Sequence, residues 1–295
     1  MLTKQIFKKI GNTPIIKLKN NDIYVKLEQF NFGGSIKSRV AYSMMQEALK
    51  DGTLKRNSNQ TILEASGGNT AIGLAILCAI YGFNLKLVIP SSYSKKKIDE
   101  LGIYGVDVVL FDGPPAIKAR EIHKQHPEYI YLDQLSNKAN PKIHYYETGQ
   151  EIVREFNHID YFLAGIGSGG TITGIGKRLK EEFGTHIVGI LPTGYSIKDK
   201  KFIKHKIQGI GIGMIPSILD MNVVDSYIHV SYDEAMEVGK YLLKEEGLFL
   251  GLSSITNIAG AIKLQQSLNK KQSIVTISPD AGDSYIENYK EYYYE

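Results

Sequence analysis

The chain has 295 residues, which is enough for one large domain or two modest ones, each with its own core. Its hydrophobic content of 43% and charged content of 22% are typical of a folded globular protein and exclude an intrinsically disordered chain. The net charge of +4 arises from 35 basic and 31 acidic residues that are mostly scattered, and this pattern argues against a nucleic-acid-binding protein.

A single cysteine and scattered histidines limit the chemistry further. One cysteine cannot form an internal disulfide or a multi-cysteine metal site, and the histidines lack metal-ligand spacing, so we expect no metal. Cys78 lies in the apolar residues 71–81 and is predicted to be buried. The N-terminus lacks the features of a signal peptide, and no window suits a membrane span. We therefore expect a cytoplasmic protein that binds no membrane.

Strand-like and helix-like segments alternate along the chain. The predicted strands are residues 15–17, 23–27, 61–64, 85–89, 107–111, 129–132, 161–164, 187–191 and 273–277. The predicted helices are residues 39–50, 70–81, 95–101, 115–124, 148–155, 171–182, 232–246 and 254–268. This alternation predicts an α/β fold with mainly parallel, buried strands, whose ligands bind at the carboxyl ends of the strands. The acidic, tyrosine-rich residues 287–295 are expected to form a surface appendage.

The first informative loop contains Lys37, within the glycine- and serine-rich residues 33–39. It follows the predicted strand 23–27 and opens the predicted helix 39–50, so its amine would project from a fixed corner. A solvated surface lysine is the ordinary alternative for any one lysine. A lysine fixed in this way suits an enzyme that holds a cofactor covalently through a Schiff base.

A second loop, residues 66–70, reads Ser-Gly-Gly-Asn-Thr between a predicted strand and a predicted helix. Its hydroxyl and amide side chains and the N–H groups of a helix N-terminus predict a receptor for a carboxylate or phenolate. An ordinary helix cap made by Asn69 or Thr70 is the alternative.

A third loop, residues 165–171, reads Gly-Ile-Gly-Ser-Gly-Gly-Thr and again joins a strand to a helix. Its glycines would let the backbone approach an anion, which the helix dipole favours. A dinucleotide site is disfavoured because the next strand ends at Leu191 and Pro192, without the carboxylate that a ribose needs. The loop also lacks the Gly-Lys-Ser/Thr of a Walker A motif. A phosphate without a nucleotide fits best, and together with Lys37 it predicts pyridoxal phosphate.

Seven short motifs, in order along the chain, resemble those of the cysteine synthase family, which includes the O-acetylserine sulfhydrylases and the catalytic domains of cystathionine β-synthases. The motifs are Gly11-Asn12-Thr13-Pro14, Lys26-Leu27-Glu28, Gly34-Ser35-Ile36-Lys37, Gly68-Asn69-Thr70, Gly167-Ser168-Gly169-Gly170-Thr171, Gln208-Gly209-Ile210-Gly211 and Gly251-Leu252-Ser253-Ser254. The resemblance implies the tryptophan-synthase-β-like fold of pyridoxal phosphate enzymes, with two domains that each hold a mainly parallel twisted sheet flanked by helices. Residues 35–142 would form a smaller mobile domain, and residues 1–34 and 143–295 would form a larger one.

The resemblance also implies a role for each matching residue. Lys37 would bind pyridoxal 5′-phosphate and then move the Cα proton of the substrate. Asn69 would hydrogen-bond the 3′ oxygen of the cofactor, and Ser253 would face its pyridine nitrogen. The cofactor's phosphate would lie against Gly167, Ser168, Gly169, Gly170 and Thr171. The substrate would be bound by Ser66, Gly67, Thr70, Gln134 and Gly209.

The implied activity is β-replacement on a serine-derived amino acid through an aminoacrylate intermediate, in first place the synthesis of cysteine from O-acetylserine and sulfide. Two departures leave the leaving group and the nucleophile open. The family usually reads Thr-Ser-Gly-Asn-Thr-Gly in the asparagine loop, so Gly67 lacks a hydroxyl that lies near the substrate's β-position in relatives. Ile255 stands where the family usually has glycine.

Several alternatives therefore stay open. Cystathionine formation, release of sulfide from cysteine and replacement on O-phosphoserine would all use the same intermediate. A non-catalytic relative that binds serine acetyltransferase is an alternative of another class, and the intact Lys37 argues against it. Relatives of this length are usually homodimers, so the resemblance implies a homodimer.

Overall fold

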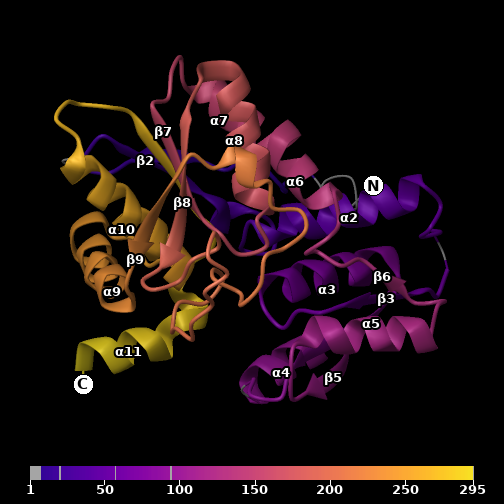
Figure 1. Ribbon diagram of the computed structural model, residues 1–295. Helices are drawn as coiled ribbons and strands as arrows, with labels where there is room; N and C mark the ends of the chain where they lie inside the picture. Colours follow the sequence, from indigo (N-terminus) through magenta and orange to yellow (C-terminus); the bar gives the residue numbers. More distant parts are fainter. Residues whose placement is uncertain (1–7, 20, 57, 94, 295) are drawn as a thin grey trace. The chain divides into compact units, whose positions relative to one another are not determined.

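The computed structural model describes residues 8–19, 21–56, 58–93 and 95–294, which form two compact units (Figure 1). Unit 1 contains residues 8–10 and Asn31–Asn140. Unit 2 contains Gly11–Phe30 and the described residues from Pro141 onward. Each unit has its own sheet and its own hydrophobic core.

In unit 1 the described strands form one parallel sheet, in the order β5-β4-β3-β6. These strands are β3 (Thr61–Glu64), β4 (Asn84–Pro90), β5 (Asp107–Phe111) and β6 (Ile130–Tyr131). The helices of the unit are α2 (Lys37–Lys50), α3 (Asn69–Tyr81), α4 (Lys95–Ile103) and α5 (Pro115–Gln125). Helix α3 is apolar along most of its length, because it is buried in the core of this unit against α2 and β4.

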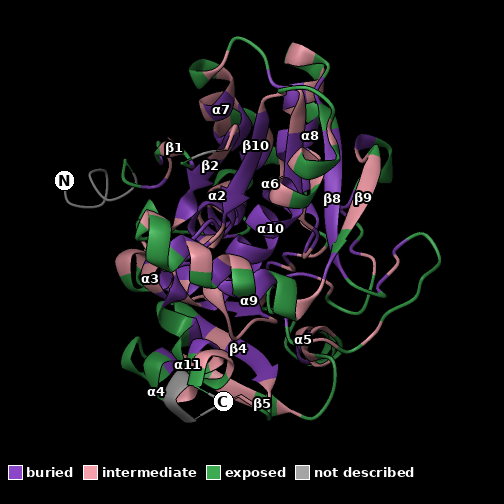
Figure 2. Ribbon diagram, turned by 90° about the vertical axis from the view of Figure 1, so that its left-hand side faces the viewer, coloured by how far each residue is buried: buried purple, intermediate pink, exposed green. Residues whose placement is uncertain are grey.

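In unit 2 the described strands form a sheet in the order β1-β2-β10-β7-β8-β9, in which only β1 runs antiparallel to its neighbour. These strands are β1 (Ile15–Lys17), β2 (Ile23–Leu27), β7 (Tyr161–Gly165), β8 (His186–Pro192), β9 (Ser226–Val230) and β10 (Ile274–Ser278). Helix α6 (Ala139–Ile143) begins in unit 1 and ends in unit 2. The other helices of unit 2 include α7 (Gly149–Glu155), α8 (Gly170–Phe183), α9 (Tyr232–Tyr241), α10 (Leu252–Ser267) and α11 (Ile286–Tyr294). Figure 2 shows β8 and β10 mostly in the colour of buried residues, as expected for mainly apolar strands inside a parallel sheet.

The expected α/β class with mainly parallel sheets is confirmed. Each predicted strand and helix has a counterpart, and the bounds coincide or differ by one or two residues, except that the helix predicted for 232–246 is α9 followed by a π-helical turn (Leu242–Glu246). Strand β9 was missed, because its Ser-Tyr-Ile-His-Val sequence is only partly buried and weakly apolar. The predicted helix 148–155 is the end of a longer helical run, in which a π-helical turn (His144–Thr148) joins α6 to α7.

The C-terminal residues do not form the expected surface appendage, although Glu295 lies outside the described residues. Helix α11 packs on unit 2, and Tyr289 is buried with its hydroxyl donating a hydrogen bond to the carbonyl oxygen of Leu250 at 2.7 Å. The aromatic rings of Phe249 and Tyr293 pack edge-on against the ring of Tyr289. Tyr289, Tyr292 and Tyr293 are therefore packing residues, whereas Tyr294 is exposed.

Two N-terminal motifs supply a buried polar cluster in unit 2. The amine of Lys26 lies 2.8 Å from a carboxylate oxygen of Glu151 and 3.0 Å from the carbonyl oxygen of Thr13. The hydroxyl of Thr13 donates a hydrogen bond to Glu28 at 2.6 Å. Because Lys26 and Glu28 are fully buried, each charge needs these partners, and the cluster fixes the chain beside β2.

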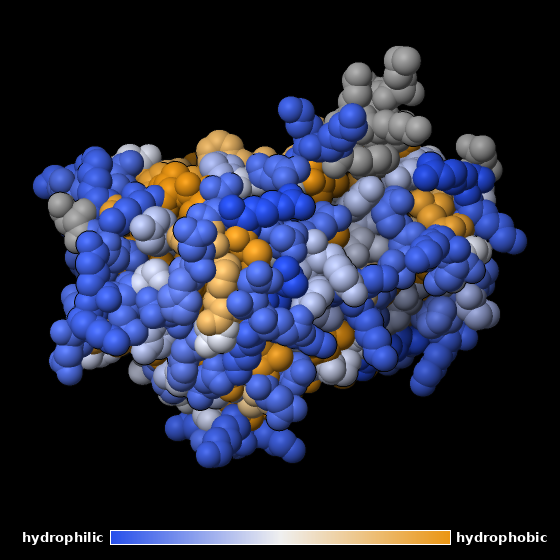
Figure 3. Space-filling view, turned by 90° about the horizontal axis from the view of Figure 1, so that it is seen from above, coloured by the Kyte–Doolittle hydropathy of each residue, from blue (hydrophilic) through white to orange (hydrophobic). Residues whose placement is uncertain are grey.

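The face of the molecule in Figure 3 is mostly hydrophilic, with apolar groups scattered between charged ones. Within the described part of the chain, no helix combines the length and the apolar character needed to cross a membrane.

Gly174 lets α8 lie against the turn that contains His144. A Cβ at Gly174 would lie 2.2 Å from the carbonyl oxygen of Pro141 and 2.6 Å from the Cβ of His144. We therefore expect Gly174→Ala to destabilise the protein by about 1–3 kcal/mol through overpacking. Gly102→Ala is the matched control, because nothing lies within 4 Å of its Cβ position, and it should be neutral or slightly stabilising. Urea unfolding of both variants measures the difference, and equal stabilities would contradict this packing.

Candidate active site

The glycine loop of unit 2 joins the carboxyl end of β7 to the first turn of α8. Gly169 precedes the helix with φ of 82°, a left-handed conformation that favours glycine, and no described side chain caps the helix. The first N–H that bonds back within this turn is that of Thr173, which donates to the carbonyl oxygen of Gly169 at 3.1 Å. Earlier N–H groups of such a turn point away from the helix, so this corner can bind an anion.

Three predicted site residues of unit 2 meet through close backbone approaches. A Cβ at Gly167 would lie only 2.2 Å from the carbonyl oxygen of Gly209. A Cβ at Gly209 would lie 3.4 Å from the Cβ and 3.5 Å from the hydroxyl oxygen of Ser253. Ser253 is 6% exposed in the first turn of α10. The structure thus places the glycine loop, Gly209 and the Ser253 hydroxyl next to one another.

Thr171, the last residue of the loop, belongs to a chain of hydrogen-bonding side chains. Its hydroxyl oxygen lies 3.4 Å from Nε2 of the buried His144, whose Nδ1 lies 3.0 Å from the hydroxyl oxygen of Thr148. His144 is thus placed to orient the Thr171 hydroxyl.

Ile255, which stands where the family usually has glycine, lies in the core of unit 2, and its side chain packs toward Gly239 of α9.

In unit 1, Lys37 is the first residue of α2, and its N–H donates to the hydroxyl oxygen of Ser35 at 3.2 Å. Helix α3 starts at Asn69, one turn before Gly73. A Cβ at Gly73 would lie 3.3 Å from the carbonyl oxygen of Lys37, so the missing side chain lets α2 and α3 approach closely. The structure therefore brings the starts of these two helices, and with them Lys37 and Asn69, into one region of unit 1.

The loop before α3 contains the residues predicted to bind the substrate carboxylate. The hydroxyl of the buried Thr70 donates a 2.7 Å hydrogen bond to the side-chain oxygen of Gln134. The hydroxyl oxygen of Ser66 accepts a long 3.4 Å hydrogen bond from the N–H of Gly68. Gln134 is held in turn, because its main-chain carbonyl oxygen accepts a 2.8 Å hydrogen bond from the side-chain amide of Asn140. The structure thus joins Thr70 to Gln134 at the N-terminus of α3, and Ser66 bonds to Gly68 within the same loop.

Glu64, at the carboxyl end of β3, was not predicted as a site residue. One of its carboxyl oxygens accepts a 3.0 Å hydrogen bond from the N–H of Ala65, and the other has no partner among the described residues. Burial raises the pKa of Glu64 to about 8, against the opposing hydrogen bond from the N–H of Ala65. The protonated form of Glu64 is therefore favoured at neutral pH, two residues before the loop of residues 66–70. The available sequence signal was a glutamate at the end of an apolar strand, shortly before a glycine-rich turn.

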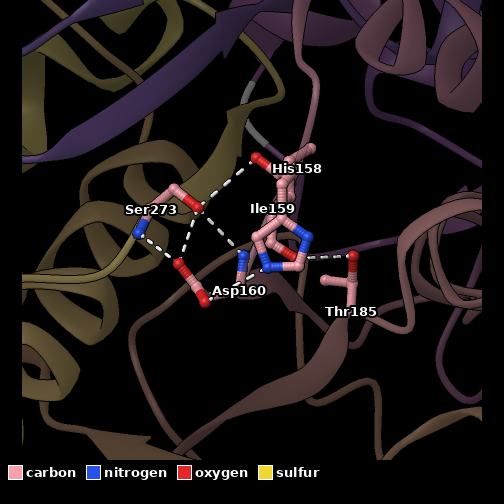
Figure 4. Close-up of polar contacts among 5 residues, drawn as sticks. All are labelled: His158, Ile159, Asp160, Thr185 and Ser273. Atoms are coloured by element: carbon pink, nitrogen blue, oxygen red, sulfur yellow. Dashed lines mark hydrogen bonds and ion pairs between the residues drawn. The ribbon is translucent and has the colours of Figure 1, made fainter.

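A serine, a histidine and an aspartate also gather in unit 2, but they do not form a catalytic triad (Figure 4). Ser273 and Asp160 exchange hydrogen bonds through their side chains and backbone N–H groups, at 2.8–3.0 Å. The imidazole of His158 lies 3.3 Å from Asp160, whereas no described contact joins it to the Ser273 hydroxyl. These residues precede β7 and β10, at the amino ends of the strands and opposite the glycine loop. The hydrogen bonds between Asp160 and Ser273 link the amino end of β7 to the amino end of β10.

A cavity in unit 2 also lies apart from the predicted site residues. Its lining includes Lys206, Tyr232, Asp233 and Glu291, and it contains none of the glycine-loop residues. Among the described residues, no group of three or more histidine, cysteine, aspartate or glutamate side chains is placed to bind a metal ion.

The chain belongs to the pyridoxal-phosphate dependent enzyme family, whose sequence pattern matches residues 6–280. In an alignment of 292 positions it is 39% identical to a cysteine synthase of Staphylococcus aureus strain Mu50, and the alignment spans 94% of this chain and 93% of that protein. In an alignment of 311 positions it is 36% identical to a cystathionine beta-synthase of Apis mellifera, and the alignment spans 97% of this chain and 61% of that protein.

Solved structures agree with this assignment. A hydrogen sulfide-producing enzyme from Fusobacterium nucleatum is 34% identical, with a TM-score of 0.89 over 95% of this chain and 98% of that chain. An O-ureido-L-serine synthase is 30% identical, with a TM-score of 0.89 over 95% and 92% of the two chains. The resemblance to cysteine synthases and cystathionine β-synthases, and the expectation of a pyridoxal phosphate enzyme, are therefore confirmed.

The residues present fit pyridoxal phosphate. The glycine loop offers a turn of backbone N–H groups at a helix start, in which a side chain at Gly167 would collide with Gly209. In unit 1, nothing lies within 4 Å of the Cβ positions of Gly34, three residues before Lys37, and of Gly68, directly before Asn69. The structure thus leaves open space at these two glycines.

The buried carboxyl of Glu64 should make stability depend on pH. Its pKa is about 8 in the folded protein and near the ordinary 4.5 when unfolded, so the folded state binds more protons between these values. Stability should therefore fall as the pH rises from about 4.5 to 8, by at most about 1.4 kcal/mol per pH unit from this group. Glu64→Gln should flatten this fall, because glutamine does not ionise.

Urea unfolding at pH 5.5 and pH 7.5 measures the slope. Glu121→Gln, which removes an exposed carboxylate paired with Lys118, is the control and should keep the parent's slope. An unchanged slope in Glu64→Gln would show that this carboxyl is ionised in the folded protein.

Proposed function

We propose that the protein catalyses β-replacement on a serine-derived amino acid, and in first place the synthesis of cysteine and acetate from O-acetylserine and sulfide. The observation that carries the proposal is that each residue implied to hold the cofactor is present in a suitable local structure, in a chain 39% identical to a cysteine synthase. The Lys37 amine extends from the start of one helix, and glycine-rich turns open two others.

The proposed roles follow from the chemistry of each group. When bound, pyridoxal phosphate supplies electron withdrawal from the Cα atom of the amino acid. Lys37 takes the Cα proton on its amine and later returns it to the same carbon. Ser66, Thr70 and Gln134 bind the substrate carboxylate and orient the Cα–H bond. Asn69 and the loop Gly167–Thr171 hold the cofactor.

The bond changes balance without any further reactant. The Cβ–O bond breaks and its electron pair leaves with acetate, while the sulfur of sulfide supplies the pair that forms the new Cβ–S bond. Ser253 would face the cofactor's pyridine nitrogen. A hydroxyl there withdraws less charge than a buried acid would, which favours chemistry in which the electron pair departs with the β-substituent.

Release of sulfide from cysteine is the second candidate, because the hydrogen sulfide-producing enzyme from Fusobacterium nucleatum is 34% identical over nearly its whole chain. Cystathionine formation and replacement on O-phosphoserine use the same proton transfer at Cα and differ only in the nucleophile or the leaving group. These alternatives stay open because Gly67 lacks the hydroxyl that is usual at this position in the family.

We also infer a cytoplasmic homodimer in which residues 35–142 form the mobile domain, as in the family that the motifs resemble. Movement of this domain would exclude water from the substrate and so limit hydrolysis. Serine acetyltransferase is the proposed protein partner. If the chain turned over no substrate, binding of that partner would become the leading function.

Replacement of Lys37 tests the centre of the proposal. Lys37→Ala should abolish the visible absorption of the protein-bound cofactor and lower turnover by at least about a hundredfold, because the covalent anchor and the base are one group. Lys50→Ala, at the exposed opposite end of α2, is the control and should leave both signals unchanged. Retained absorption and turnover in Lys37→Ala would remove Lys37 from this role.

The choice of substrate is tested with the purified protein and four amino acids: O-acetylserine, O-phosphoserine, serine and cysteine. Each is mixed in turn with sulfide, with homocysteine or with no added nucleophile, and the products are separated and quantified. We expect cysteine and acetate in equal amounts from O-acetylserine and sulfide. Preferred release of sulfide from cysteine would replace the first candidate with the second.

A further inference from the structure

Gly67 lies against the ring of Tyr93 inside unit 1. A Cβ at Gly67 would lie 2.7 Å from Cε1 and 3.0 Å from Cζ of Tyr93, and 3.0 Å from Cγ2 of the buried Ile89. Carbon atoms in contact are normally about 3.5–4.0 Å apart, so no side chain fits at Gly67 while the ring holds this place. The glycine and the tyrosine therefore form a matched pair.

The hydroxyl-bearing end of the ring is the part that meets Gly67. The phenolic oxygen is bonded to Cζ, one of the two ring atoms nearest to the Cβ position of Gly67. A serine at this position would carry its own hydroxyl one bond beyond Cβ. The phenolic oxygen of Tyr93 therefore lies in the neighbourhood that a serine hydroxyl would use.

The parallel sheet explains why Tyr93 reaches this loop. Strands β3 and β4 are adjacent and parallel, so the segments that follow them leave the same edge of the sheet. Tyr93 follows β4, and its N–H donates to the carbonyl oxygen of Pro90 at 3.1 Å. Its ring is partly buried against the core of unit 1, and burial raises its pKa, so the hydroxyl remains a hydrogen-bond donor at neutral pH.

We propose that Tyr93 is a specificity-determining residue whose phenolic hydroxyl donates a hydrogen bond to an oxygen-linked leaving group on the β-carbon of the substrate. This inference rests on the proposed function. In an α-amino acid the carboxylate carbon and the β-carbon are bonded to the same atom. A substrate whose carboxylate binds at Ser66 and Thr70 therefore brings its β-substituent within reach of a residue packed against Gly67.

The hydroxyl alone is tested by Tyr93→Phe, which keeps the ring. The ratio of kcat/KM for O-acetylserine to kcat/KM for cysteine should fall about fivefold to tenfold, because ester oxygens accept hydrogen bonds better than sulfur does. Tyr81→Phe is the control, since Tyr81 lies at the opposite end of α3 and accepts a hydrogen bond from Gln46. It should leave the ratio unchanged.

The pairing is tested by exchanging the two groups. Gly67→Ser alone should lower the melting temperature by about 2–6 °C, because it overpacks the contact with Tyr93. In a Tyr93→Ala background the same change should cause no such loss. The double variant should return the kcat/KM ratio to within about threefold of the parent, because a hydroxyl is again present.

Failure of the proposed function and failure of the role of Tyr93 give different experimental results. If the parent protein turns over none of the amino acids, the proposed function is wrong and the role of Tyr93 falls with it. If the parent turns over O-acetylserine but Tyr93→Phe leaves the ratio within twofold, the proposed function stands and this inference is overturned. An equal loss of melting temperature from Gly67→Ser in both backgrounds would also overturn it.

Discussion

The close approach of Gly167 to the carbonyl oxygen of Gly209 is the constraint on which the architecture of unit 2 depends. At that point two main-chain segments meet with no room for a side chain. The N–H of Gly211 adds a 2.9 Å hydrogen bond to the carbonyl oxygen of Ile166, so the two segments are also bonded together. The loop after β7 is thereby held by backbone groups, which leaves its N–H groups in a fixed arrangement before α8.

In unit 1 a close approach also depends on a glycine, but there it lies between two helices. The starts of α2 and α3, which carry Lys37 and Asn69, are brought close by Gly73, which lets the two helices pack without an intervening side chain. At the carboxyl end of β3, shortly before the loop of residues 66–70, the carboxyl of Glu64 lies beside the buried hydroxyl of Tyr131 and the carboxyl of Asp133. Such a polar interior is costly to bury, and burial favours the protonated form of Glu64.

Much of this arrangement could be predicted from the sequence, because the informative residues are adjacent in the chain. Continuous apolar runs revealed the buried parallel strands, and small residues between strands and helices revealed the loops. The residues proposed for the site could be named for the same reason, although their roles are still proposals. Strand β9 escaped prediction because it is half-buried and follows a long irregular stretch.

Other features depend on contacts between distant residues and could not be read from local patterns. Tyr93 lies 26 residues after Gly67, in a run of serines and lysines that suggests only an exposed turn. The proton on Glu64 depends on complete burial, which no short sequence pattern specifies. The tyrosines of α11 were expected at the surface because their neighbours are acidic, yet the ring of Tyr289 packs in the core of unit 2.

The position of Cys78 has a consequence for a protein that handles sulfur compounds. It holds the only thiol in the sequence, it lies in the core of unit 1, and burial raises its pKa to about 12. Thiolates, not thiols, exchange with disulfides, so a folded molecule offers no group that cystine or a polysulfide could capture. Oxidation of small sulfur compounds around the protein can therefore change the supply of its substrates without changing the redox state of the enzyme itself.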